Sequence, residues 1–214
     1  VAIDRSIMLI LMALIAAASL LGWIEDFRGL SVRVRAGLQL LLGIFATTAL
    51  VWTMEQSYWW VPVGALAIAA YINVANFMDG VNGISGLHGI AVGVLYAVAG
   101  QLSDHVWMTV AGAVTAAAFA AFLPWNLGRG SVFMGDVGSQ FCGFVLAVLA
   151  VVASRFEGVE LSFLIVPMLL SGVLFDVAFT LIRRGLAGER ITEAHRGHLY
   201  QVAQRSGVPW LIVT

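Results

Sequence analysis

Residues 58–102 read YWWVPVGALAIAAYINVANFMDGVNGISGLHGIAVGVLYAVAGQL, and this stretch indicates the class of the protein. Two apolar runs, residues 58–75 and 84–102, flank a polar octet at residues 76–83. A helix needs about 17–25 apolar residues to cross a bilayer, so each run is long enough. A segment in lipid must also satisfy its own backbone hydrogen bonds, and each run is therefore predicted to be a transmembrane helix.

The rest of the chain has the same pattern. Of its 214 residues, 61% are hydrophobic and 11% are charged, whereas roughly a quarter of an average soluble domain is charged. We therefore predict an all-α, polytopic transmembrane helical bundle that forms a single membrane domain. The seven predicted spans are residues 6–24, 36–54, 58–75, 84–102, 106–123, 139–154 and 161–182. An eighth is expected to begin near Gly207, and the chain is interpreted as a fragment lacking N-terminal and C-terminal helices.

The arginines predict the orientation of these spans. If the spans alternate, all eleven basic residues except Arg5 and Arg155 fall in loops on one side of the membrane. Loops rich in Arg and Lys usually face the cytoplasm, so this side is predicted to be cytoplasmic. The polar clusters of the chain lie on the same side, which makes a common site there more probable than any one cluster does.

The octet at residues 76–83 combines two amides, a carboxylate and two glycines. Asn76, Asp79 and Asn82 offer oxygen ligands to a hard cation, and Gly80 and Gly83 allow a positive φ and a close approach of backbone N–H groups to phosphate. The alternative is a short polar turn built from ordinary turn residues.

Two further clusters contain carboxylates. Glu25 and Asp26 are adjacent, and paired carboxylates suit proton transfer or metal binding; the alternative is ordinary charge at a helix end, with the following arginines as a membrane anchor. Asp136 follows Gly135 at the start of an apolar run, where its carboxylate and nearby N–H groups could frame a Mg²⁺–phosphate. The alternative there is a glycine-rich turn that is capped by Asp136.

The last polar loop contains His195, Arg196 and His198. Two histidines three residues apart are a weak zinc signal, whereas donors beside an arginine suit a pyrophosphate. Asp176 lies inside the last predicted span, and we interpret it as a structural residue paired with an arginine or a neighbouring helix. His88 is interpreted as a core histidine.

These motifs resemble those of the polyprenyl-phosphate N-acetylhexosamine-1-phosphate transferases, which are integral membrane enzymes. Glu25-Asp26 stands where the family has paired aspartates, with Glu25 in place of the first. Residues 76–83 resemble the family's nucleotide-sugar loop, and residues 133–139, FMGDVGS, are similar to its metal-binding aspartate motif. Residues 195–201, HRGHLYQ, are most similar to the O-antigen-initiating branch, although Gly197 stands where relatives often have His.

The resemblance implies an enzyme of the bacterial inner membrane with its active site on the cytoplasmic face. It would transfer HexNAc-1-phosphate from a UDP-N-acetyl amino sugar to undecaprenyl phosphate, release UMP, and initiate O-antigen or related cell-envelope polysaccharide synthesis. The expected cofactor is Mg²⁺, with Mn²⁺ as the alternative. Membrane lipid is an expected partner, nucleic acid is not, and a homodimer is left open.

The resemblance also implies a role for each candidate residue. Asp136 with Asn76 would hold the metal, and Asp26 with Glu25 would orient or deprotonate the lipid phosphate. Nucleotide and pyrophosphate binding would fall to Asp79, Gly80, Asn82, His195, Arg196 and His198, with Arg33 and Arg35 as further candidates.

Two other classes of function remain open at this point. A transporter or channel places polar groups near mid-membrane and often has repeated halves, whereas here only Asp176 and His88 lie away from one interface. An inactive scaffold of a polysaccharide complex would be marked by Glu25 and the altered histidine motif.

Overall fold

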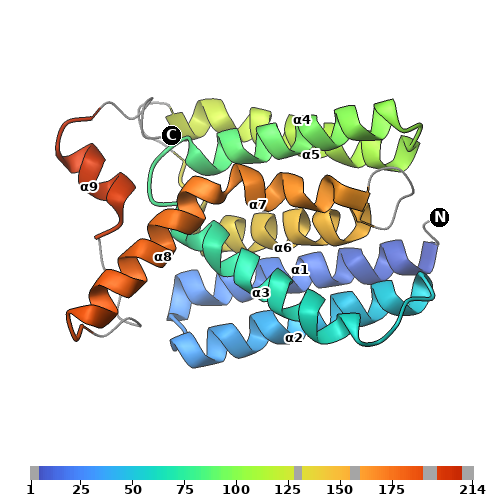
Figure 1. Ribbon diagram of the computed structural model, residues 1–214, viewed down its shortest axis with the longest axis horizontal. Coiled ribbons are helices and arrows are strands. Elements are labelled where there is room, and N and C mark those ends of the chain that lie inside the picture. Colours follow the sequence, from blue (N-terminus) through green and yellow to red (C-terminus); the bar gives the residue numbers. More distant parts are fainter. Residues whose placement is uncertain (1–4, 128–131, 155–159, 190–196, 209–214) are drawn as a thin grey trace.

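The computed structural model describes residues 5–127, 132–154, 160–189 and 197–208, and within these ranges the chain is helical and contains no strand. The helices run side by side as a bundle, which confirms the predicted all-α membrane architecture (Figure 1). Their bounds are α1 Arg5–Arg28, α2 Val32–Thr53, α3 Trp60–Met78, α4 Ile84–Leu102, α5 Val106–Leu127, α6 Gly135–Ala153, α7 Ile165–Leu169, α8 Ser171–Leu186 and α9 Leu199–Arg205.

Six of the described helices, α1 to α6, are long and apolar enough to cross a membrane. A seventh span results if α7 and α8 are counted together. Residues 209–214, where the predicted eighth span would continue, lie outside the described residues.

The helices extend further into the predicted polar loops than expected. Glu25 and Asp26 lie in the last turn of α1, and Asn76 lies in the last turn of α3. Helix α1 continues because nothing in its sequence breaks it before Gly29, whose N–H donates to the carbonyl of Glu25 at 2.9 Å. The polar side chains therefore project from helix ends, where the backbone holds them more rigidly than a loop would.

The predicted span at residues 161–182 is not one continuous α-helix. A 3-10 helix, Glu160–Leu164, leads into α7, and the axis then bends by 57° before α8. Pro167 cannot donate a backbone hydrogen bond and Gly172 has no side chain, and the two residues flank the break. This bend directs α8 toward the end of the bundle that carries the polar motifs (Figure 1).

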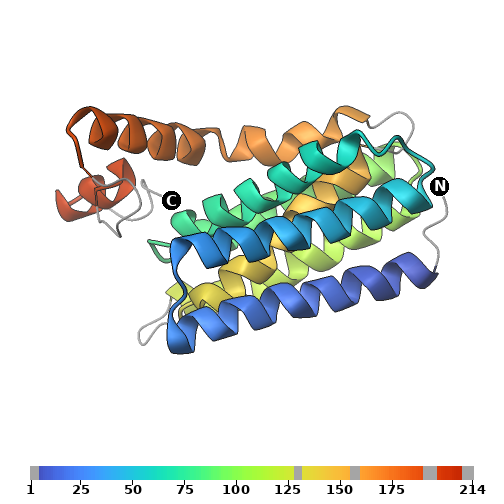
Figure 2. The same ribbon diagram turned by 90° about the horizontal axis from the view of Figure 1, so that it is seen from below.

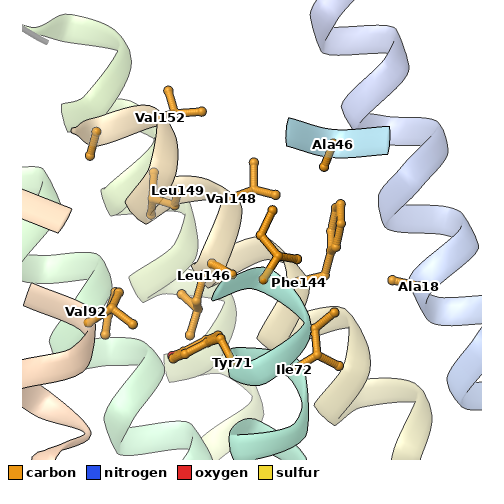
Figure 3. Close-up of a cluster of buried hydrophobic side chains, with 14 of the residues drawn as sticks. Ala18, Ala46, Tyr71, Ile72, Val92, Phe144, Leu146, Val148, Leu149 and Val152 are labelled. Carbon is orange, nitrogen blue, oxygen red and sulfur yellow. The ribbon is translucent and has the colours of Figure 1, made fainter. Parts of the chain in front are cut away.

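Helix α6 lies at the centre and packs against both α1 and α3. Figure 3 shows Phe144 of α6 on the side that faces Ala18 and Ala46, and Leu146 on the side that faces Tyr71 and Val92. Small residues allow the backbones of neighbouring helices to approach closely, as is common in membrane bundles. A Cβ on Gly143 would lie 2.7 Å from the Cα of Ile72.

One end of the bundle collects the ends of the helices that carry the motifs. The C-terminal ends of α1 and α3 and the N-terminal end of α6 lie there, opposite the end where α1 begins (Figure 1). Figure 2 shows that α8 extends beyond the bundle at this end and that α9 lies below it. Motifs far apart in the sequence therefore share one region of space.

Candidate active site

Asp26, Asn76 and Asp136 come from three helices and meet at this end of the bundle. The amide Nδ2 of Asn76 donates hydrogen bonds to Oδ1 of Asp136 and, at 2.9 Å, to Oγ of Ser139. The carboxylate of Asp26 accepts from the backbone N–H groups of Asp136 at 2.9 Å and Val137 at 3.0 Å. Asp136 thus contacts both Asp26 and Asn76, which the sequence placed in separate loops.

The N-terminus of α6 explains why Asp26 lies there. Its first N–H groups have no partner within the helix, and the helix dipole favours a negative charge at this position. Asp26 satisfies both requirements from α1. Gly135 has a φ of +63°, and a Cβ at this glycine would lie 3.0 Å from Oδ2 of Asp26, so a side chain would strain the backbone and crowd the carboxylate.

The donor atoms in this cluster suit a hard cation. Within the described residues no three or more His, Cys, Asp or Glu side chains form a group that could hold a metal ion. Magnesium does not need such a cage, because it usually takes one or two carboxylates together with waters and substrate phosphates. The carboxylate of Asp136, with Asn76 beside it, matches this requirement. Asn76 presents its Nδ2 to Asp136, so its own Oδ1 is the atom that would reach a cation.

Glu25, next to Asp26 in the sequence, faces the interior of the bundle instead. It is buried; its Oε1 accepts from Nη1 of Arg35 at 2.5 Å and its Oε2 accepts from Nε2 of Gln140 at 2.8 Å. Both oxygens are therefore engaged within the protein. Arg35 is likewise used in this ion pair, whereas Arg33 is exposed on the first turn of α2.

The contacts of Glu25 continue into a buried polar network across α1, α2, α3 and α6. Nε2 of Gln39 donates to Oε1 of Gln140 at 3.2 Å, and Nδ2 of Asn73 donates to Oε1 of Gln39. The sequence analysis did not identify Gln140 or Asn73. The signal was available, because an amide inside an apolar run is costly to bury unless it has a partner.

Asp79 lies in the turn between α3 and α4, beside the cluster. Its Oδ1 accepts from Oγ of Ser85 at 2.9 Å. Burial raises the pKa of Asp79 to about 6; the charge of Asp136 adds to this effect and the Ser85 hydrogen bond opposes it. Asp79 is thus a carboxyl group that gains or loses its proton close to neutral pH.

Asn126 links this turn to the segment before α6. Its Oδ1 accepts from the backbone N–H of Gly83 at 2.6 Å, and its Nδ2 donates to the carbonyl of Val132 at 3.0 Å. Gly83 has a φ of +96°, as expected from the sequence. The same expectation for Gly80 is wrong: Gly80 is not among the described glycines with positive φ, and a Cβ there would overlap the hydroxyl of Tyr200. Asn82 is half-buried in the same turn.

The histidine motif lies partly within the described structure. His195 and Arg196 lie outside the described residues, whereas His198 is buried. The ring of His198 stacks on that of Tyr200 at a centroid distance of 5.7 Å and lies 6.2 Å from the ring of Phe77. Since Phe77 precedes Asp79 by two residues, the motif lies against the Asp79 turn.

Asp176 contacts this motif. Its Oδ1 accepts from the N–H of Leu199 at 2.7 Å and from Oγ1 of Thr180 at 3.1 Å, and its Oδ2 lies 3.5 Å from Nδ1 of His198. Because Leu199 begins α9, this agrees with the interpretation that Asp176 pairs with an arginine or a neighbouring helix. His88 is buried and shares a 2.8 Å hydrogen bond with Tyr71, as expected of a core histidine.

An apolar cavity of about 620 Å³ lies between α2, α3, α6 and α7. Its lining runs along α3 from Trp60 to Val74, two residues before Asn76. On the other side it includes Leu170 and Leu174, so it ends near Asp176. Its residues on α3 and α8 extend furthest toward the polar end, whereas those on α2 and α6 lie in the opposite halves of these helices.

Residues 8–154 of the chain match the model of glycosyl transferase family 4. The chain is 28% identical over 193 residues to the probable undecaprenyl-phosphate N-acetylglucosaminyl 1-phosphate transferase of Bacillus subtilis (strain 168), which covers 84% of this chain and 53% of that protein.

Two further relatives are similar to the same extent. The undecaprenyl-phosphate alpha-N-acetylglucosaminyl 1-phosphate transferase of Yersinia pestis is 28% identical over 219 residues, or 90% of this chain and 58% of that protein. The decaprenyl-phosphate N-acetylglucosaminephosphotransferase of Mycobacterium tuberculosis (strain CDC 1551 / Oshkosh) is 28% identical over 217 residues, or 84% and 52%. The chain thus spans about half the length of the curated relatives it matches.

Proposed function

This chain belongs to glycosyl transferase family 4, and we propose that the protein transfers N-acetylhexosamine 1-phosphate from a UDP-sugar to undecaprenyl phosphate. A phosphate oxygen of the lipid would attack the phosphorus that carries the sugar. The bond to the second phosphate would break, and UMP would leave. The observation that carries the proposal is the contact between Asp26, Asn76 and Asp136, which brings two carboxylates and an amide together at one end of a membrane bundle.

Such a reaction between anions depends on charge neutralisation and alignment more than on covalent help. Asp136, with Asn76 beside it, would hold Mg²⁺, or Mn²⁺ in its place. When bound, the metal supplies positive charge to the diphosphate. Hydrogen bonds from Asn76 to Asp136 and Ser139 would keep the Asp136 carboxylate in one orientation.

Asp26 would act as a positioning group for the lipid phosphate. Its two oxygens accept N–H groups at the start of α6, which ties the end of α1 to the helix that carries Asp136. This arrangement favours positioning over proton abstraction. Glu25 would support Asp26 from within the bundle, because its own oxygens are engaged with Arg35 and Gln140.

The remaining groups would bind the nucleotide sugar. Asp79, Gly80 and Asn82 would contact the nucleotide, and His198, together with His195 and Arg196, would contact the pyrophosphate. Arg33 is exposed and is a further candidate for binding the negatively charged pyrophosphate. The site would face the cytoplasm of a bacterial inner membrane, and the product would start O-antigen or related envelope polysaccharide.

The apolar cavity would take part of the undecaprenyl chain. It approaches Asn76 along α3, so a chain lying in it would have its phosphate near the polar cluster. Its lining is mostly apolar, which suits an isoprenoid and does not suit the hydrated path of a transporter.

The test uses the full-length protein in membranes, with undecaprenyl phosphate, MgCl₂ and a panel of UDP-N-acetyl amino sugars that begins with UDP-N-acetylglucosamine. We expect UMP release that EDTA stops and added Mg²⁺ restores. Asp136→Ala and Asp26→Asn should each lower the rate at least about a hundredfold, because each removes charge or alignment from the transition state.

The matched control is Asp104→Asn, the same kind of substitution in an exposed carboxylate at the opposite end of the bundle, and it should retain the wild-type rate. Near-wild-type UMP release from Asp136→Ala or Asp26→Asn would refute the assignment. Flux of a labelled solute into proteoliposomes without UMP release would instead support a transporter.

A further inference from the structure

We propose that Asp176 is a positioning residue that holds the His198 segment, residues 197–200, against the Asp79 turn. The proposal rests on the proposed function, because it assigns to the same site a residue outside the four sequence motifs. Asp176 lies within α8, in the last span, where a buried carboxylate is costly unless it has partners.

Three consecutive residues of the segment are fastened to α8. Nη2 of Arg183 donates to the carbonyl of Gly197 at 3.1 Å. Oδ2 of Asp176 lies 3.5 Å from Nδ1 of His198, and Oδ1 accepts from the N–H of Leu199 at 2.7 Å. The carboxylate therefore accepts a hydrogen bond from the backbone at Leu199 and lies beside the ring of His198, with no hydrogen bond between Oδ2 and Nδ1.

The carboxylate itself is held in place. Thr180 lies one turn further along α8, is completely buried, and donates from Oγ1 to Oδ1 of Asp176 at 3.1 Å. One oxygen thus accepts two hydrogen bonds while the other faces the imidazole. A carboxylate beside Nδ1 favours a ring orientation that turns this nitrogen toward it.

The opposite side of the segment is attached to the end of α3. The hydroxyl of Tyr200 donates to the carbonyl of Phe77 at 2.8 Å, and Gly80 leaves the space that this hydroxyl occupies. Burial raises the pKa of Tyr200 to about 12, so the group remains a hydroxyl donor at neutral pH. The segment is therefore clamped between α8 and the turn that carries Asp79.

This geometry gives Asp176 a specific effect on substrate binding. If His198 contacts the pyrophosphate, loss of the Asp176 carboxylate releases the ring while the metal cluster stays intact. Asp176→Asn keeps an oxygen that can accept from Leu199 but removes the charge that faces His198. We expect the KM for the UDP-sugar to rise by about tenfold, with a smaller change in kcat. Tenfold is the lower end of the effects seen when a hydrogen-bonding partner of a functional histidine is lost.

A double-mutant cycle with His198→Ala separates positioning from a general structural role. If Asp176 acts through His198, Asp176→Asn should change KM in the wild-type background and add nothing in His198→Ala. Additive effects, or an unchanged KM in Asp176→Asn, would overturn the proposal. Asp104→Asn serves again as the control that should leave KM unchanged.

A second measurement does not depend on activity. Trypsin can cleave within residues 183–205, which contain several arginines, and Asp176→Asn should speed this cleavage in the detergent-solubilised protein whereas Asp104→Asn should not. Equal cleavage rates in Asp176→Asn and wild type would contradict the clamp. If the wild-type protein released no UMP, the proposed function would fail, and the cleavage rates would still decide whether Asp176 holds the segment.

Discussion

Glu25 and Asp26 are adjacent and chemically alike, yet they have different surroundings. Asp26 contacts the start of α6, where the candidate metal ligands lie, while Glu25 is buried between Arg35 and Gln140. The resemblance of the pair to a family motif suggests a shared role. Their contacts instead divide the roles, with Asp26 at the site and Glu25 supporting it.

Glu25→Gln should therefore destabilise the protein more than it impairs the chemistry. The substitution leaves Arg35 without its buried counter-charge, and breaking such a pair typically costs about 3 kcal/mol. We expect a lower Tm in detergent and a UMP release rate, per folded molecule, that falls less than in Asp26→Asn. A variant with wild-type Tm and no activity would show instead that Glu25 takes part in the reaction.

Asp79 allows a test of pH dependence. Because its pKa is raised from 3.8 to about 6, the folded protein binds a proton between these pH values that the unfolded chain has already released. The titration of Asp79 therefore lowers the free energy of unfolding as the pH rises from about 4 to about 6. Above about pH 6 this stabilising contribution is lost completely.

Asp79→Asn should remove this contribution while keeping an acceptor for Ser85. The Tm of the variant relative to wild type should increase between about pH 4 and pH 6 and stay constant above, because only the wild type titrates there. Thermal unfolding of both proteins in the same detergent across that range measures the difference. A constant difference throughout would mean that Asp79 is not desolvated in the folded protein.

At the scale of helices, the site depends on how closely α1 approaches α6. Gly22 faces the backbone of Asp136, and a Cβ there would overlap the carbonyl oxygen of that residue. This contact lies about one turn from Asp26. Separation of the two helices would therefore pull Asp26 away from the N–H groups that donate hydrogen bonds to it.

Gly22→Ala should lower UMP release by about a hundredfold, since a displacement near 1 Å of a positioned group has effects of that size. The matched control is Gly37→Ala on α2, where an added Cβ meets nothing within 4 Å. That control should be active and slightly more stable, because Ala favours a helix over Gly. Equal activity in both variants would show that the approach of α1 to α6 does not control the site.

At the scale of the whole molecule, the polar end and the apolar cavity would serve the two substrates separately. Ala67 lines the cavity, whereas its neighbour Leu66 is exposed and does not. Ala67→Trp should raise the KM for undecaprenyl phosphate at least several-fold by filling the space, and leave the KM for the UDP-sugar unchanged. Leu66→Trp is the control, and kinetics with each substrate varied in turn measure both values. If the two variants gave the same KM for the lipid, the cavity would not hold its chain.

Hydropathy and loop charge were sufficient to predict an all-α membrane bundle and to group the polar motifs on one side. Hydropathy and loop charge are properties of short segments. They predict membrane spans well because an unsatisfied polar group is costly to bury in lipid. The expectation that Asp26, Asn76 and Asp136 meet depended on the family resemblance in addition. The bend before α8 was not predicted, and the position of Glu25 and Asp26 at a helix end was considered only as the alternative interpretation of that pair.

What only the tertiary structure decided is the direction in which each side chain faces. Rotation of α1 against α6 points Asp26 to the site and Glu25 into the bundle, and the bend before α8 brings Asp176 to His198. Both outcomes depend on contacts between helices far apart in the chain. Such contacts follow from how whole helix surfaces pack, and no pattern within a single segment of the sequence contains that information.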